Sequence, residues 1–165
     1  MGHGVEAAGH RDAAPAAVPF PSLAWFRRLA ALMNADRARY EHLGYVDCVA
    51  QFTVVDAKAG LPWSVQVTFE EFAAVDVREA PPQDAERADF DLEASLATWR
   101  AMIESIAAGN GRPDLEQTLN HLSHMGTPVT VRSADPLRRD LYFRYNQSLQ
   151  EFFNASAAFR TEFAS

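Results

Sequence analysis

The chain has 165 residues, of which 48% are apolar and 22% charged, and its formal net charge is −7. This length predicts one domain, because domains cluster at about 100–200 residues, and it allows a substantial buried core or a core with a cavity. The acidic balance argues against a nucleic-acid partner, since phosphate contacts need a concentrated basic face.

The cysteine content and the apolar runs limit the class of protein further. Cys48 is the single cysteine, which excludes an internal disulfide and a metal site built from several thiolates. No apolar run reaches the ~20 residues of a membrane-spanning helix, and the first residues lack the pattern of a secretory signal. We therefore expect a soluble, cytoplasmic protein. The use of arginine in place of nearly all lysine is typical of a bacterial one.

Residues 1–21 contain glycine, alanine and proline but no periodic apolar face. Such a segment cannot bury enough apolar surface to offset the entropy lost on ordering. We interpret it as a disordered leader and residues 22–165 as the folded domain.

The first predicted element is a helix over residues 23–43. Ser22 can cap its start, apolar residues follow at helical spacing, and Gly44 stands where a left-handed residue would end the helix. Trp25 falls outside the apolar stripe. A stripe of this kind is typical of a helix that packs on a core.

Four segments with period-two alternation follow, which is the pattern of strands that bury one face. They span residues 46–54, 63–69, 72–78 and 88–92. A short turn separates the first two segments, which predicts a hairpin.

The second half of the chain predicts three helices and one strand. The helices span residues 96–106, 113–125 and 136–159, and the strand spans residues 128–131. Ser95 and Asp135 are suitable N-cap residues for the first and last of these helices. Strands grouped in a meander, with helices clustered separately, indicate an α+β fold.

Few sequence motifs point to catalysis or to binding of a metal or cofactor. Phosphate-binding loops and the strand-to-helix turn of a serine nucleophile do not occur in the sequence. His121 and His124 lie three residues apart, but zinc needs three or four ligands and the sequence offers no convincing third. We therefore expect no metal site, no cofactor and no catalytic residue.

The outward faces of the predicted strands carry the remaining polar groups. Asp76 and Arg78 lie two residues apart on one face, where they can form a surface ion pair. If that face were covered, they would be the polar pair of most interest. Asp89, Asp91 and Glu93 alternate with the inward residues of the fourth strand, and we expect them to point outward.

Aromatic residues are the more informative feature of the composition. Eleven phenylalanines and three tryptophans belong to a chain with a small predicted sheet. They fit either a filled core or a lipid-sized cavity lined by aromatic and methionine side chains. The sequence alone leaves both interpretations open.

Three stretches resemble the sterol carrier protein-2 (SCP2) family. Residues 50–69 are similar to the first hairpin of that family, with a short acidic and glycine turn and a tryptophan at the head of the second strand. Residues 88–103 look like its last meander strand running into the central helix. Gly126, the strand 129–131 and Asp135 are similar to its glycine, short strand and Gly-Asp ending.

The resemblance spans about residues 44–136 and departs from the family in two places. This chain has a fuller predicted helix over residues 113–125, where the family has a brief turn. It also has Ala134 before Asp135 in place of the usual glycine. Both departures fall near the tunnel mouth of SCP2-like proteins, so they bear on the size and identity of the ligand.

The resemblance implies an α+β fold with a five-stranded antiparallel sheet and helices on one face, around an apolar tunnel. SCP2-like proteins bind sterols, fatty acids, acyl-CoA or other lipids, usually without catalysis. We therefore expect this chain to bind and carry or present a sterol, a fatty acyl or an isoprenoid-like lipid. By position, the tunnel lining comprises Phe52, Trp63, Val65, Val67, Phe90, Trp99, Met102, Ile103, Ile106, Leu119, Leu122, Met125 and Phe152.

Two other functions stay open. A small isomerase, cyclase or dehydratase could use the same cavity for a hydrophobic metabolite, with Asp47, Asp76, His121 or His124 as its ionisable group. A homodimer or a lipid enzyme as partner would instead use an exposed apolar patch. The enzyme alternative depends on whether any of the four ionisable side chains points into the cavity.

Overall fold

The computed structural model describes residues 16–124 and 128–164 of the chain. Residues 1–15 of the predicted leader, Met125 of the predicted tunnel lining and Gly126 lie outside the described residues. None of the helices in the described part of the chain is long and apolar enough to span a membrane.

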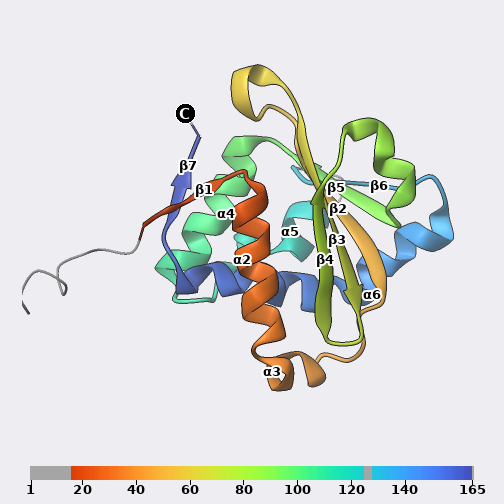
Figure 1. Cartoon of the computed structure of the whole chain (residues 1–165), viewed down its shortest axis with the longest axis horizontal. Helices are drawn as coiled ribbons and strands as arrows, with labels where there is room; N and C mark the ends of the chain where they lie inside the picture. The colour runs from red at the N-terminus through yellow and green to blue at the C-terminus, as the bar shows by residue number, and fades with distance from the viewer. Residues whose placement is uncertain (1–15, 125–127, 165) are drawn as a thin grey trace, which may run out of the picture.

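A five-stranded sheet forms one layer of the molecule (Figure 1). Its strands are β2 (Cys48–Val54), β3 (Trp63–Glu70), β4 (Ala73–Glu79), β5 (Phe90–Ala94) and β6 (Thr130–Arg132). They lie in the order β4-β3-β2-β5-β6, and every neighbouring pair is antiparallel except β2 and β5. The predicted α+β fold with a five-stranded sheet is confirmed, and this one parallel pair corrects the expectation of a wholly antiparallel sheet.

The parallel pair changes the path of the chain after β4. Strands β2 and β4 both run antiparallel to β3, so β2, β4 and β5 all point in one direction. The chain must return from the end of β4 to the start of β5, which a tight hairpin cannot achieve. It crosses the outer face of the sheet through the 3-10 helix η3 (Pro82–Arg87), where the carbonyl of Asp84 accepts a hydrogen bond from Gln66 of β3. The fourth predicted strand therefore does not continue a meander but lies on the far side of β2.

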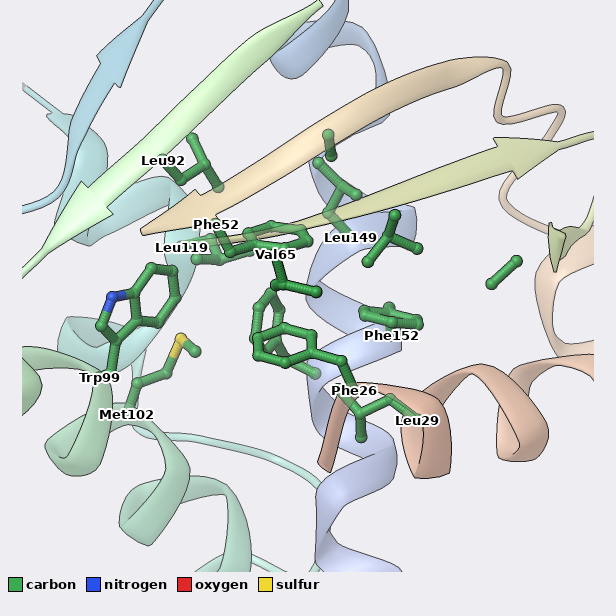
Figure 2. Packing of buried hydrophobic residues seen from close by; sticks show 14 of the residues in the cluster. Phe26, Leu29, Phe52, Val65, Leu92, Trp99, Met102, Leu119, Leu149 and Phe152 are labelled. Atoms are coloured by element: carbon green, nitrogen blue, oxygen red, sulfur yellow. The ribbon is translucent and has the colours of Figure 1, made fainter. Parts of the chain in front are cut away.

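Helices cover the inner face of the sheet. They are α2 (Leu23–Asn34), α3 (Arg37–Glu41), α4 (Leu96–Ala108), α5 (Leu119–Ser123) and α6 (Pro136–Asn154), with the 3-10 helices η4 (Leu115–Gln117) and η6 (Ala155–Ala158). The side chains of Ser22, Ser95 and Asp135 each accept a backbone N–H bond at a helix start, as predicted. Figure 2 shows strand side chains pointing toward α2, α4 and α6.

Two predicted helices are interrupted in the structure. The segment predicted as one helix over residues 23–43 ends its first part at Asn34, so α2 and α3 are separate. The segment predicted as a helix over residues 113–125 forms only η4 and α5 within its described part. The backbone of Thr118 is extended between them, and its hydroxyl caps α5 by accepting from the backbone N–H of His121.

A short ribbon joins the two ends of the described chain. Strand β1 (Val18–Phe20) pairs in parallel with β7 (Thr161–Phe163) (Figure 1). The prediction of a disordered leader is wrong for β1, because Phe20 is 1% exposed and its ring lies 6.0 Å from the ring of Phe163. The last helix ends at Asn154 rather than at residue 159, since the chain turns back there to form the ribbon.

The ribbon explains the position of Trp25. This side chain lies outside the predicted apolar stripe of α2, yet it is fully buried. Its Nε1 donates to Thr161 Oγ1 at 3.0 Å, and its ring packs edge-on against Phe20 at 4.7 Å and Phe159 at 5.9 Å. Strands β1 and β7, at the two ends of the described chain, thus cover a second apolar surface of α2.

Replacing Thr161 with Val is expected to lower the free energy of unfolding by about 1–3 kcal/mol, because the buried N–H of Trp25 loses its acceptor. Urea unfolding followed by circular dichroism measures the change. In a Trp25→Phe background, which has no N–H to satisfy, the same substitution should cost much less. Equal costs in both backgrounds would show that this hydrogen bond does not hold the ribbon.

Candidate functional site

The described residues of the predicted tunnel lining come together between the sheet and the helices. They are Phe52 on β2, Trp63, Val65 and Val67 on β3, Phe90 on β5, Trp99, Met102, Ile103 and Ile106 on α4, Leu119 and Leu122 on α5, and Phe152 on α6. All are at most 6% exposed apart from Trp63, which is half-buried. We call this set and the rings packed against it the apolar layer.

Aromatic rings fill the centre of the apolar layer (Figure 2). Phe52 stacks on Phe26 of α2 with 5.6 Å between ring centroids and meets Phe153 of α6 edge-on at 5.0 Å. Trp99 stacks on Phe153 at 5.5 Å, and its Nε1 donates to the carbonyl of Thr53 at 3.0 Å. A ligand that enters between the sheet and the helices must therefore displace side chains. Phe26 and Phe153 are missing from the predicted lining, although helical spacing marks both as core residues.

A pocket of about 730 Å³ opens beside the apolar layer, between the terminal ribbon and the loop that joins β2 to β3. Its walls are Pro19, Phe20, Pro21, Glu162, Phe163 and Ala164 at the ribbon, and Ala57, Lys58, Leu61, Pro62 and Trp63 at the loop and the start of β3. Most of these side chains are apolar, and the volume lies in the ~300–1,000 Å³ range of small-molecule sites. We call this the ribbon pocket.

Trp63 and Phe20 stand between the ribbon pocket and the buried rings. The ring of Trp63 stacks on Phe26 at 5.8 Å, and its Nε1 donates to the carboxylate of Glu79. Phe20 approaches Phe26 at 6.1 Å, and Phe26 in turn stacks on Phe52. A continuous series of aromatic rings thus leads from the ribbon pocket to the centre of the apolar layer.

The four ionisable residues of the enzyme alternative all lie on the surface. Asp47, Asp76, His121 and His124 are exposed, so none of them points into the apolar layer. Within residues 16–124 and 128–164, no three histidine, cysteine, aspartate or glutamate side chains form a group able to hold a metal ion. The homodimer and the lipid-enzyme partner stay predictions.

A buried polar network lies on the outer face of the sheet. Gln51, Thr53, Ser64 and Gln66 are at most 4% exposed, and Asp91 of β5 is 5% exposed. The crossover through η3 covers this face, which corrects the expectation that Asp91 meets solvent. The sequence contained an indication that this face is covered. Uncharged Gln, Thr and Ser stand at positions where a solvent-exposed strand usually carries Lys or Glu.

Hydrogen bonds connect the polar network from strand to strand. Thr53 Oγ1 donates to Asp91 Oδ1 at 2.8 Å, and Gln51 Nε2 reaches Asp91 Oδ2 at 3.4 Å. Gln66 Nε2 donates to Gln51 Oε1 at 2.8 Å. Arg78 donates to Gln66 Oε1 at 2.9 Å, so its guanidinium extends the network rather than forming the predicted surface ion pair.

Burial raises the pKa of Asp91 to about 7. The hydrogen bond from Thr53 lowers this pKa, the negative charge of Glu93 raises it, and the guanidinium of Arg132 lowers it, but burial is the largest effect. Asp91 is therefore a carboxyl group that changes its charge near neutral pH.

Comparisons with known proteins agree with this architecture. No family model and no curated protein sequence matches the chain. The crystal structure of sterol carrier protein 2 matches with a TM-score of 0.59 and 20% identity, over 82% of this chain and 95% of that one. The chain has an SCP2-like fold.

A second solved structure gives the same result. It is the solution structure of a conserved hypothetical protein from Thermus thermophilus, described as a possible sterol carrier protein. It matches with a TM-score of 0.64 and 17% identity, over 91% of this chain and 97% of that one. The resemblance inferred from the sequence is confirmed for the fold.

Replacing Asp91 with Asn is expected to stabilise the protein increasingly as the pH rises from about 4 to about 7. The unfolded chain loses the Asp91 proton at about pH 3.9, whereas the folded protein keeps it until about pH 7. Over that interval the wild-type free energy of unfolding falls by up to about 1.4 kcal/mol per pH unit, and Asn removes this loss.

Urea unfolding of both proteins at several pH values between about 4 and 8 measures this difference. Asp76→Asn, which removes an exposed carboxylate from the same face of the sheet, is the matched control. If the difference in unfolding free energy between Asp91→Asn and wild type stays constant with pH, the raised pKa of Asp91 is contradicted.

Proposed function

We propose that this protein binds and carries or presents a hydrophobic ligand, a sterol, a fatty acyl or an isoprenoid-like lipid, between its sheet and its helices without catalysing a reaction. The observation that carries the proposal is the series of aromatic rings that connects the ribbon pocket to the apolar layer. The SCP2-like fold supports it, because one solved structure with this fold is sterol carrier protein 2.

The proposed route of entry is the ribbon pocket. A ligand that reaches Trp63 and Phe20 from this side can move their rings aside and then contact Phe26 and Phe52. Strands β1 and β7 have three residues each, and a ribbon of this length has little stability of its own. The wall formed by the ribbon lies outside the five-stranded sheet, so it can shift without breaking a hydrogen bond of that sheet.

Burial of apolar surface supplies enough free energy for such binding. Micromolar affinity requires about 8 kcal/mol, which corresponds to roughly 330 Å² of apolar surface at about 25 cal/mol per Å². The displacement of packed rings and the association entropy increase the area needed. A sterol or a long acyl chain has more apolar surface than this binding requires, whereas a small polar metabolite has less.

Native mass spectrometry of freshly purified protein, followed by organic extraction, is the direct test of the ligand class. The proposal expects a stoichiometric adduct that extraction identifies as a lipid, or saturable uptake when fatty acids, sterols and isoprenoids are added. A protein that arrives without a lipid and takes up none of these three classes would overturn the proposal.

Trp63→Glu is expected to weaken binding of a fluorescent polyene fatty acid by about tenfold or more, because it removes the stacking on Phe26 and adds a charge at the pocket. Trp63→Phe should keep the affinity within about threefold, since an aromatic ring remains. Leu115→Glu changes a side chain that is 84% exposed and outside the ribbon pocket, so it is the control. Unchanged affinity in a folded Trp63→Glu variant would exclude this route of entry.

A further inference from the structure

A second pocket lies over the polar network, on the face of the sheet opposite the apolar layer. It has a volume of about 540 Å³. Thr53 and Asp91 contribute to it from the sheet, Ala85 and Glu86 from the crossover η3, Glu93 from β5, Val131, Arg132, Ser133 and Ala134 from β6 and the residues after it, and Arg139 from α6. We call this the crossover pocket.

The polar network presents the Asp91 carboxylate to this pocket as an acceptor. Thr53 donates to one carboxylate oxygen and Gln51 reaches the other, and both of these donors are themselves held by side chains of β3. Asp91 is 5% exposed, so its orientation is fixed by these bonds and by the covering crossover. The Asp91 carboxylate is therefore held in a fixed position in the crossover pocket, unlike a mobile side chain on the surface.

The Asp91 carboxylate forms no ion pair among the described residues, although the charge of Arg132 lowers its pKa. Arg132, which stands opposite Asp91 on β6, forms an ion pair with Glu93 at 2.6 Å. Arg78 donates to Gln66, and Arg139 donates to the carbonyl of Val131 at 3.3 Å. A buried carboxylate without an ion pair is costly to ionise, so a cationic ligand would stabilise its charged form.

We propose that the crossover pocket binds a small organic ammonium ion whose N–H groups donate to the Asp91 carboxylate. The pocket has three carboxylates, Asp91, Glu86 and Glu93, against the two guanidinium groups of Arg132 and Arg139, so its formal charge favours a cation over an anion when Asp91 is ionised. Most of its lining residues are polar or charged, which suits a small polar ion rather than a lipid. This ligand differs in chemistry and in place from the one proposed for the apolar layer.

The proposal predicts a specific dependence on pH. The charged groups that face Asp91 are Glu93 on its own strand, Arg132 on β6, Glu86 on η3 and Arg139 on α6. With the pKa of Asp91 at about 7, the ionised fraction rises about tenfold between pH 6 and pH 8, while an alkylammonium ion with a pKa of about 10.4 stays charged. The affinity should rise by about the same factor over that interval.

The experiment uses the full chain and n-butylammonium chloride as the probe, at constant ionic strength. Carboxyl carbon NMR of ¹³C-labelled aspartate follows Asp91 directly, and 1-butanol and butanoate are the neutral and anionic counterparts. We expect butylammonium alone to shift the Asp91 signal, to lower its pKa, and to bind about tenfold more tightly at pH 8 than at pH 6.

Matched variants separate the buried carboxylate from general surface charge. Asp91→Asn should weaken butylammonium binding by about tenfold or more, whereas Asp76→Asn, which removes an exposed carboxylate of the same sheet face outside the pocket, should change it by less than about threefold. Asp91→Asn should leave fatty-acid binding intact, so failure here is distinguishable from failure of the proposed lipid function. If Asp91→Asn does not fold, the pH dependence in the wild-type protein decides.

Three outcomes would overturn the proposal. They are equal binding of butylammonium and 1-butanol, tighter binding of butanoate than of butylammonium, and an affinity that does not change between pH 6 and pH 8 (about tenfold is expected). Each of these would mean that the Asp91 carboxylate does not receive a cation.

Discussion

The crossover from β4 to β5 is the constraint on which the other features of this protein depend. Because β5 lies parallel to β2, the chain has to pass over the outer face of the sheet, and η3 covers it there. A sheet covered on both faces must satisfy the polar groups that it buries. Gln51, Gln66 and Asp91 do so by bonding to one another across three strands. The opposite face carries rings and aliphatic side chains, so one sheet separates two environments of different chemistry.

The ends of the described chain determine how accessible the apolar environment is. The ribbon of β1 and β7 is held by Trp25 and by Arg100, whose guanidinium lies 4.9 Å from the ring centroid of Phe163. Neither strand of the ribbon belongs to the five-stranded sheet. Movement of the ribbon can therefore widen the ribbon pocket without breaking a hydrogen bond of that sheet. This arrangement suits the uptake and release of a ligand that we propose, because the sheet can stay intact while the ribbon moves.

Local sequence rules were sufficient for most elements and insufficient for long-range pairing. The caps at Ser22, Ser95 and Asp135 follow from side-chain chemistry within a few residues, and period-two alternation located the strands. Val18 and Thr161 pair although they are far apart in the chain, and three-residue strands are too short to show a period. The alternation also assigns a residue such as Asp91 to a face without telling whether another segment covers that face.

The candidate site likewise contains residues that the sequence predicted and residues that it missed. The resemblance to SCP2 proteins led to side chains that share the apolar layer, because such a layer follows from the order of strands and helices. It did not lead to Phe26 and Phe153, which come from the two helices outside or at the edge of the matched stretch, nor to the ribbon. On strand β2, Thr53 belongs to both environments: its carbonyl accepts from Trp99 and its hydroxyl donates to Asp91. A substitution at Thr53 disturbs both faces at once, whereas Trp63 and Asp91 each belong to one face and allow the two to be examined separately.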